Sequence, residues 1–364
     1  MSSLVEKYQP CSFATMVGQR DAVQWCRQQV ANGSFKNALF SGPTGTGKTT
    51  LARIYARAIL CCDAGQNRPC NNCDECRSWL NEGCHDGYRE VDCAESRDYA
   101  KIQETVEVIS KGLVWQSRFV LVLDEAQRIS RPAFDLLLKP LERPEKPTTV
   151  ILATSEPGKI PASLRGRLQS VDFRPLAFDE SLIALCDVCR REGIPFDVDA
   201  VALIVDFAKG SQREALKLLE QAFQAEGVIE NAGVRALLGL EGVDRTSDFV
   251  IAMLSGKTRE VLDQLPRWVS KPEEKADAIQ RLLLFVFQTE VLRMRSSDPL
   301  VAALSREHTE AISSRMAELA QARALDLSYF WRSTIHLWDP TPAATEASLI
   351  ARAERFTALM APNV

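Results

Sequence analysis

The sequence predicts an α/β fold with a parallel sheet, followed by a helical C-terminal half, on three observations. Residues 37–41 (NALFS) form a short apolar run that leads into glycines and then into a helical pattern from Lys48 to about Ile59, the order strand, loop, helix. The runs 119–123 (FVLVL) and 149–153 (TVILA) are continuously apolar, as expected of strands buried in a parallel sheet. After residue 176 the strand patterns stop, and short breaks separate helical segments.

Length and composition predict a multidomain protein without a membrane span. A chain of 364 residues exceeds the usual size of one domain, and we expect boundaries that give domains at 1–176, 177–241 and 242–364. The composition, 46% hydrophobic and 25% charged, suits a folded globular protein, and no run of about 18 apolar residues is present. The net charge of −4 means that any contact with nucleic acid needs a local basic surface.

Cysteine usage favours a metal site over disulfides. The first ten residues, MSSLVEKYQP, lack the basic flank and apolar middle of a secretory signal, so we expect a cytoplasmic location. Seven of the eleven cysteines fall between Cys61 and Cys93. In a reducing compartment such clustering indicates metal binding.

The glycine-rich segment from Gly42 to Thr49 (GPTGTGKT) fits the P-loop pattern for phosphate binding. Glycines let backbone N–H groups turn inward around phosphates at the start of a helix. We expect Lys48 to neutralise the β- and γ-phosphates and Thr49 to ligate Mg²⁺. The strand before the loop and the helix after it are the context that this motif requires.

Two acids follow the second apolar run and complete a nucleotide site. Asp124 is expected to hold Mg²⁺ through water, which leaves Glu125 as the base that orients the attacking water. The third run ends in Thr154 and Ser155, polar side chains placed to sense a γ-phosphate, although this signal is weak by itself. The alternative is that Asp124 and Glu125 only belong to a solvated loop after the strand.

Three closely spaced cysteines, Cys70, Cys73 and Cys76, predict a structural Zn²⁺ site with Cys61 or Cys62 as its fourth ligand. Four thiolates leave no open coordination position, so the metal would staple a loop and would not activate water. The alternatives are free cysteines in a mobile loop, or substitution by other nearby ligands, namely Cys84, His85 and Cys93. The pair Cys186 and Cys189 lies in an amphipathic helical stretch, where we expect buried ordinary thiols.

The order and the residues of these motifs resemble those of the γ/τ subunit of the bacterial DNA polymerase III clamp loader. The resemblance extends over nearly the whole chain. The resemblance rests on residues 7–10 (KYQP), 17–19 (VGQ), 124–130 (DEAQRIS), 161–169 (PASLRGRLQ) and 210–216 (GSQREAL). It implies an AAA+ P-loop NTPase domain with an inserted zinc-binding loop, then a small helical lid domain and a helical collar. Gln9 replaces the usual arginine, and Pro140 is expected to end or kink the helix after the acidic box.

The resemblance also assigns individual residues. Cys61 is preferred to Cys62 as the first zinc ligand, Thr154 senses the γ-phosphate, and Arg167 is an arginine finger acting in trans, with nearby Arg165 as its competitor. Arg213 would reach the nucleotide from the lid domain. The nucleotide-binding residues expected in all are Tyr8, Pro10, Val17, Gly42, Thr44, Gly45, Thr46, Gly47, Lys48, Thr49, Thr50, Asp124 and Arg213.

The function that the resemblance implies is an ATP-hydrolysing motor subunit that opens a sliding clamp and loads it on primer-template DNA. Its cofactors would be ATP, Mg²⁺ and Zn²⁺, and its partners would be delta, delta-prime and further gamma-like subunits in a pentameric hetero-oligomer, together with clamp and DNA. Arg97 and Lys101 are candidate phosphate contacts. Two rivals remain: a non-hydrolysing subunit akin to delta-prime, and a zinc-stabilised nucleic-acid-binding protein that ATP only regulates.

Overall fold

The structure is a computed structural model of the 364-residue chain and divides into two compact units, 1–228 and 229–364. It describes residues 3–63, 65, 68–82, 86–93, 99–110, 118–142, 147–238, 251–253, 257, 259, 261–262, 275, 279–280, 314 and 350–353. Most of the predicted collar, 242–364, therefore lies outside the described residues, and the predicted boundaries at 176 and 241 stay predictions. No helix in the described part of the chain is long and apolar enough to cross a bilayer.

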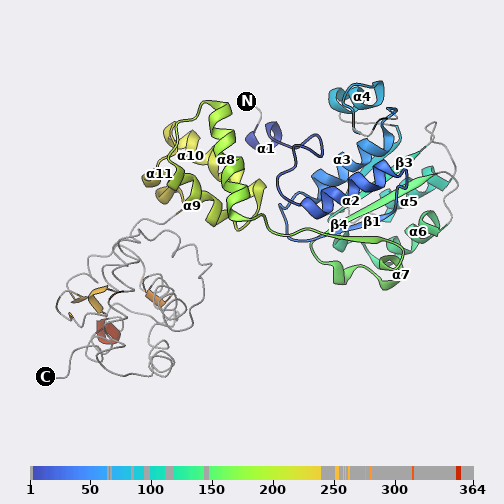
Figure 1. Ribbon diagram of the computed structural model, residues 1–364. Helices are drawn as coiled ribbons and strands as arrows, with labels where there is room; N and C mark the ends of the chain where they lie inside the picture. Colours follow the sequence, from blue (N-terminus) through green and yellow to red (C-terminus); the bar gives the residue numbers. More distant parts are fainter. Residues whose placement is uncertain are drawn as a thin grey trace. The chain divides into compact units, whose positions relative to one another are not determined.

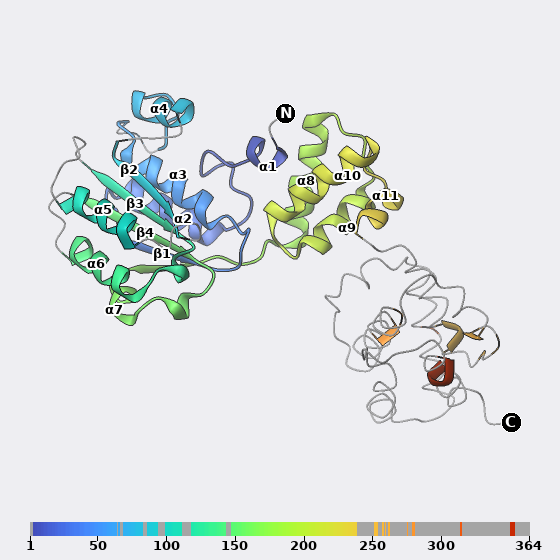
Figure 2. The ribbon, with the colours of Figure 1, turned by 180° about the vertical axis from the view of Figure 1, so that it is seen from behind.

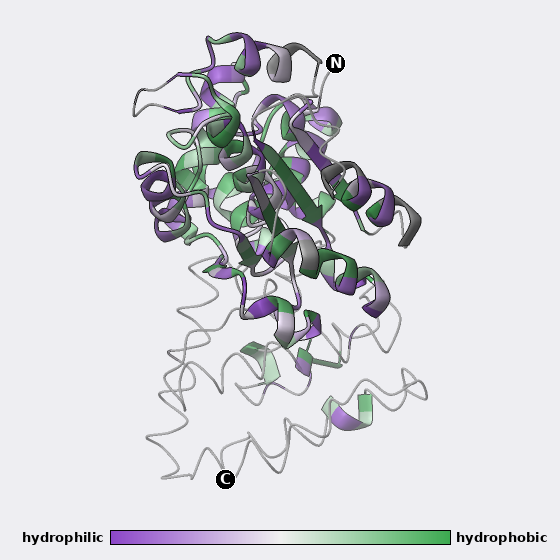
Figure 3. Cartoon of the chain, turned by 90° about the vertical axis from the view of Figure 1, so that its right-hand side faces the viewer, coloured by the Kyte–Doolittle hydropathy of each residue, from purple (hydrophilic) through white to green (hydrophobic). Residues whose placement is uncertain are grey.

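A five-stranded parallel sheet forms the centre of the first unit, in the order β2-β3-β4-β1-β5. Its strands are β1 (Ala38–Ser41), β2 (Tyr88–Asp92), β3 (Phe119–Asp124), β4 (Thr148–Thr154) and β5 (Gln169–Asp172). The runs expected to be buried strands are β1, β3 and β4, which are almost entirely buried. Figure 3 shows strands of the sheet coloured as hydrophobic in the interior of the domain. The predicted parallel α/β architecture is confirmed.

Helices cover both faces of this sheet, as Figure 1 and the reverse view in Figure 2 show. On one face α2 (Arg20–Ala31) and α3 (Lys48–Leu60) share an apolar core with β1, β3 and β4. On the other face the core is formed with α5 (Tyr99–Ser110), α6 (Arg131–Glu142) and α7 (Ala162–Arg165). Pro140 lies inside α6, which continues to Glu142, so the proline does not end the helix at once.

The cysteine-rich segment follows α3 and leads into α4 (Asp74–Glu82), which lies beyond the C-terminal end of α3 (Figure 1). A tilted aromatic pair, Trp79 of α4 and Tyr88 of β2, has its ring centroids 4.1 Å apart. This contact ties the inserted segment to the edge strand of the sheet.

Helices alone follow the sheet in the described residues, as expected from the loss of strand patterns after 176. They are α8 (Phe178–Glu192), α9 (Val198–Ala208), α10 (Gln212–Glu226) and, in the second unit, α11 (Asn231–Leu237). The GIP break at 193–195 ends α8, where Gly193 takes the left-handed conformation with φ 65°. Helices α8, α9 and α10 pack together, and the N-terminal helix α1 (Leu4–Lys7) packs on α10.

Candidate nucleotide site and cysteine cluster

The predicted nucleotide residues gather at the carboxyl ends of three adjacent strands. In the sheet β4 lies between β1 and β3, with Thr154 in register with Ser41, the last residue before the P-loop. Asp124 ends β3 and is in register with Asp92 of β2. Parallel strands present their carboxyl ends at one edge, where ligands of open α/β sheets bind. Thr154 is thereby placed between the P-loop and the acidic pair.

Close approach of other backbone and side-chain atoms explains the P-loop glycines. A Cβ on Gly42, where φ is 151°, would lie 2.3 Å from the carbonyl oxygen of Phe173. One on Gly45, where φ is 78°, would lie 2.0 Å from Oγ of Ser211 at the start of α10. L side chains disfavour these conformations and have no room there. The loop therefore packs against both the end of the sheet and the helical domain.

Lys48, the first residue of α3, is buried and turns back onto the loop. Its Nζ donates to the carbonyl oxygens of Gly42 and Pro43, both at 2.8 Å, and Thr46 Oγ1 also donates to Pro43 at 2.8 Å. Burial lowers the pKa of Lys48, while the carboxylates of Glu125 and Asp124 oppose the shift. A positive charge is thus held inside the ring of the loop. Of its neighbours, Thr44 is exposed, whereas Gly47 and Thr50 are half-buried.

A direct hydrogen bond joins the two halves of the site. Thr49 Oγ1 donates to Asp124 Oδ2 at 2.7 Å, and the backbone N–H of Glu125 donates to Asp124 Oδ1 at 3.0 Å. Burial raises the pKa of Asp124, against the lowering effect of these two hydrogen bonds. A half-buried carboxylate beside a threonine hydroxyl is a pair of hard oxygen ligands suited to Mg²⁺.

Gln127, which the sequence analysis did not single out, links the remaining polar groups of the site. It lies in a short 3₁₀ turn, Ala126–Arg128, that follows Glu125. Its Nε2 donates to Glu125 Oε2 and, at 3.0 Å, to Ser155 Oγ, while its Oε1 accepts from Thr154 Oγ1 at 2.8 Å. One amide side chain therefore fixes both Glu125 and Thr154. Its place two residues after the acidic pair was the only available signal.

The N-terminal segment is tied to the helical domain rather than left free. Tyr8 Oη donates to Glu192 at the end of α8, and Lys7 pairs with the same carboxylate at 2.7 Å. Desolvation and the Glu192 hydrogen bond raise the pKa of Tyr8 to about 12. Pro10 and Val17 are half-buried in the chain that leads to α2.

The two predicted arginines occupy different places. Arg213 lies in the first turn of α10, exposed, and its Cβ is 3.7 Å from the position that a Cβ on Gly45 would take. It is therefore brought to the P-loop. Arg167 is exposed after α7, and its guanidinium donates to the carbonyl oxygen of Ser163 and pairs with Glu142 of α6. Its hydrogen bonds are thus made to α6 and α7 and not to the P-loop side chains.

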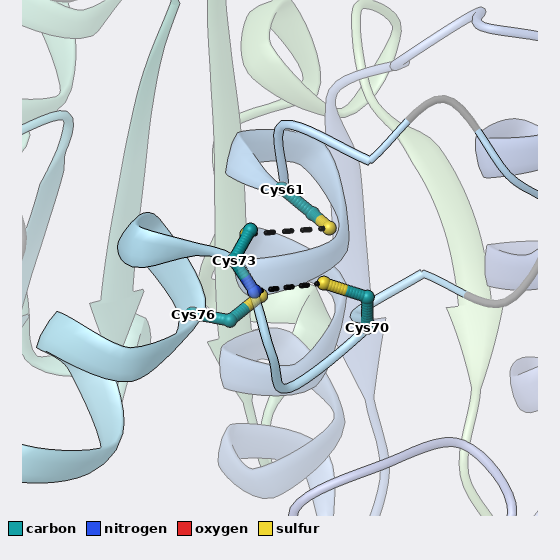
Figure 4. A group of neighbouring side chains, drawn as sticks. All are labelled: Cys61, Cys70, Cys73 and Cys76. Carbon is teal, nitrogen blue, oxygen red and sulfur yellow. Dashed lines mark hydrogen bonds between the residues drawn. The ribbon is translucent and has the colours of Figure 1, made fainter.

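Four cysteines converge as the spacing predicts. The Sγ atoms of Cys61, Cys70, Cys73 and Cys76 all lie within 4.8 Å of one another (Figure 4), and those of Cys61 and Cys73 are 3.9 Å apart. Four thiolates arranged tetrahedrally around Zn²⁺, with bonds of about 2.3 Å, have sulfurs about 3.8 Å apart. Burial opposes ionisation of Cys73, but backbone N–H groups of Cys76 and Cys62 outweigh it and lower its pKa to about 6. The cluster is compatible with zinc.

The alternative ligands lie elsewhere or outside the described residues. Cys62 is exposed and does not join the cluster, although it follows Cys61 directly. Cys93 is buried at the end of β2, where its thiol donates to the Val91 carbonyl oxygen at 3.6 Å. Cys84 and His85 are not among the described residues, and neither is Arg97, while Lys101 lies in the first turn of α5. Both Cys186 and Cys189 are buried in α8, as expected of ordinary thiols.

Solved structures show the same fold. The RuvB Holliday junction branch migration motor of Thermotoga maritima superimposes with a TM-score of 0.50 at 16% sequence identity, covering 68% of this chain and 79% of that one. At this identity the match concerns the fold alone, an α/β domain followed by helices.

Sequence comparisons identify the family. Residues 18–177 match the family model described as DNA polymerase III, delta subunit. DNA polymerase III subunit gamma/tau of Mycoplasma genitalium is 32% identical over 71% of this chain and 44% of its own length, and subunit tau of Escherichia coli K12 is 29% identical over 87% and 49%. DNA polymerase III subunit gamma of Buchnera aphidicola (Baizongia pistaciae) is 27% identical over 90% of this chain and 88% of its own length. The chain spans about half the length of the first of these relatives. It belongs to the DNA polymerase III gamma/tau family.

Proposed function

We propose that this chain is the ATP-hydrolysing motor subunit of a DNA sliding-clamp loader. One observation carries the ATPase assignment: the hydrogen bond between Thr49 of the P-loop and Asp124 of the acidic strand end, with Glu125 beside it. A Mg²⁺-nucleotide site needs this union of a phosphate-binding loop with a carboxylate and a general base. Clamp loading comes from family membership, because gamma and tau are subunits of DNA polymerase III.

At the phosphate end, the backbone N–H groups of Gly42 to Thr49 would surround the β- and γ-phosphates and Lys48 would neutralise them. Thr49 and Asp124 would hold Mg²⁺, which offsets charge on the phosphate oxygens. Glu125 orients a water toward the γ-phosphorus and accepts its proton as ADP leaves. When nucleotide binds, the single hydroxyl hydrogen of Thr154 would turn from Gln127 Oε1 to a γ-phosphate oxygen, while Gln127 continues to hold Glu125.

Groups from other parts of the chain would complete the site. Tyr8, Pro10 and Val17 border the adenine, and Arg213 reaches the phosphates from the start of α10. Arg167 would act on the nucleotide of a neighbouring subunit, which is consistent with its exposure and with its separate partners in this chain. Since an arginine finger is worth about 10³ to 10⁵ in rate, full activity requires the assembly.

Zn²⁺ held by Cys61, Cys70, Cys73 and Cys76 would be structural. Four sulfur ligands fill its coordination sphere, so the metal supplies a crosslink between the end of α3 and α4 and no chemistry. The closeness of the four sulfurs supports this assignment, and Cys61 rather than Cys62 is the first ligand that it favours.

The assembly follows from the family. We propose a pentameric hetero-oligomer with delta, delta-prime and further gamma-like subunits, which holds a sliding clamp and is triggered by primer-template DNA. Lys101, in the turn of α5 that follows β2, is the candidate among described residues for a DNA phosphate contact, with Arg97 as the second.

Two other functions compete with the motor. A non-hydrolysing delta-prime-like subunit is favoured by the family model, which bears the name of a delta subunit. An ATP-regulated nucleic-acid-binding protein would also contain a zinc loop. The joined Thr49, Asp124 and Glu125 support the motor over both, because a protein that only binds ATP has no need of the base.

ATP turnover of the reconstituted assembly separates these functions. In the motor, Glu125→Gln lowers kcat by about 10²- to 10⁴-fold, the usual value of a general base, and leaves nucleotide affinity unchanged. Glu156→Gln, a nearby exposed carboxylate paired with Lys159, is the matched control and changes neither. Equal turnover of wild type and Glu125→Gln would exclude the motor. Stimulation by primed DNA tests the DNA part separately, and a flat rate would contradict it.

A further inference from the structure

A buried arginine precedes the cysteine cluster, and among the residues that the structure describes it has no carboxylate partner. Arg57 is in α3, one turn before Cys61, and is only 5% exposed. Its Nη1 donates to the carbonyl oxygen of Cys11 at 3.1 Å and its Nη2 to Oδ1 of Asn71 at 2.6 Å, while its Nε is buried with no partner. Both acceptors are neutral, so these hydrogen bonds leave the charge of the guanidinium uncompensated.

Such a charge is costly unless an anion lies nearby. A guanidinium stays protonated in proteins, and a buried ion without a counter-charge is strongly destabilising. Four thiolates around one Zn²⁺ carry a net charge of about −2, by the sum of four single negative charges and the two positive charges of the metal. The metal-loaded cluster would therefore be an anion in the loop that Arg57 contacts through Asn71.

Asn71 makes the connection between them. It lies between the ligands Cys70 and Cys73 in the left-handed conformation, with φ 58°. Its backbone N–H lies close enough to the sulfur of Cys76 to act toward a lower pKa of that thiol, against the raising effect of burial. The same residue thus holds a ligand with its backbone and the arginine with its side chain.

The third contact of this arrangement leads out of the cluster. Cys11 stands directly after Pro10, one of the residues expected near the adenine, and two residues before Phe13, which is part of the core beneath α2 and α3. A substitution of Arg57 therefore removes a hydrogen bond of the N-terminal segment, which borders the nucleotide if the proposed function holds.

We propose that Arg57 is a positioning residue of the zinc site: it balances the charge of the loaded cysteine cluster, orients it through Asn71, and couples metal loading to the N-terminal segment through the carbonyl of Cys11. The zinc site then supports the nucleotide side of the domain as well as the loop that contains it. The inference concerns zinc retention and local order, so it can be tested whether or not the protein hydrolyses ATP.

Zinc affinity is measured on the full chain by competition with a chromogenic chelator. Loss of an outer partner usually lowers metal affinity by about 10- to 100-fold, and we expect this of Arg57→Gln. Arg57→Lys keeps the positive charge but cannot donate to both acceptors as a guanidinium does. Its zinc affinity should lie between those of the wild type and Arg57→Gln. Arg77→Gln is the matched control, because Arg77 also donates to an asparagine of this loop, Asn72, but is exposed. Its affinity should equal that of the wild type.

Hydrogen exchange tests the coupling. In the wild type, removing zinc should speed amide exchange in residues 12–15, and Arg57→Gln should show this faster exchange even when saturated with zinc. If Arg57→Gln binds zinc within twofold of the wild type, the charge-balancing role is wrong. If residues 12–15 exchange equally with and without zinc, the coupling is wrong.

A second variant protects the test against misfolding. Asn71→Gly leaves Arg57 in place but removes its acceptor, and glycine adopts the left-handed φ of 58° at this position without strain. We expect a severalfold loss of zinc affinity with an unchanged circular dichroism spectrum. If Arg57→Gln does not fold, wild-type zinc affinity in Asn71→Gly overturns the proposal.

Discussion

Replacement of Gly45 by alanine should uncouple the P-loop from the helical domain. An added Cβ lies 2.0 Å from Oγ and 3.0 Å from Cβ of Ser211, and 3.7 Å from Cβ of Arg213. The first two distances require a shift, and the third is an ordinary contact. Ser211 cannot move freely, because its Oγ accepts the backbone N–H of Glu214 at 3.3 Å and caps α10.

Two contributions set the magnitude. A side chain in the left-handed region costs about 1–2 kcal/mol. Displacing Ser211 forfeits a helix cap worth about 0.5–2 kcal/mol. Gly45→Ala should therefore destabilise the nucleotide-free protein by about 1.5–4 kcal/mol. In a Ser211→Gly background, which by itself costs only a few tenths of a kcal/mol at a cap, about 1–2 kcal/mol of that should remain.

The assay is urea unfolding of the full chain, followed by tryptophan fluorescence and far-ultraviolet circular dichroism, for the two single variants and the double variant. Gly227→Ala serves as the control, since Gly227 has φ 71° and no atom within 4 Å of the added Cβ. Gly227→Ala therefore measures only the free-energy cost of an alanine in the left-handed conformation. If Gly45→Ala costs the same in both backgrounds, within about 0.5 kcal/mol, the contact with Ser211 does not couple the two parts.

Three further predictions concern the site itself. Gln127→Ala should lower ATP turnover of the assembly about tenfold with unchanged nucleotide affinity, because Glu125 and Thr154 lose their common partner; unaltered kcat would contradict this role. Burial raises the pKa of Asp124, so the stability that this carboxyl contributes is present below its ordinary pKa and is lost as the pH rises through the raised one. Asp124→Asn should therefore raise the urea midpoint at pH 7 in Mg²⁺-free buffer, and a lower midpoint would refute the sign. Glu142→Gln frees Arg167 from an exposed ion pair and should speed turnover of the assembly by about two- to fivefold, whereas an unchanged rate would mean that the pair does not restrain the arginine.

Local patterns were sufficient for the elements of the sheet domain. Continuous apolar runs became β1, β3 and β4, and the glycine-rich segment precedes α3 as expected. These predictions succeed because a parallel strand is buried on both faces and must be apolar throughout, whatever its neighbours are. Pro140 was expected to end or kink its helix, and α6 ends at Glu142, two residues after it.

Contacts between distant segments could not be predicted in the same way. The one signal for Gln127 in the sequence is its place two residues after the acidic pair, and its role appears only when β4 brings Thr154 and Ser155 beside it. Arg57 is equally inconspicuous, since its position in a helical pattern does not reveal that Cys11 and Asn71 meet at its guanidinium. Spacing alone likewise did not decide whether Cys61 or Cys62 is the fourth zinc ligand.

By itself the sequence determined the chemistry that this chain contains: a P-loop, an acidic pair after a strand, and a set of closely spaced cysteines. Those features are local, because each depends on residue types a few positions apart. The tertiary structure decided which groups meet. The strand order places Thr154 between the P-loop and Asp124, the end of α3 directs Cys61 into the cluster and leaves Cys62 outside, and the start of α10 closes on Gly45. These outcomes depend on the packing of segments far apart in the chain, which no short stretch of sequence specifies.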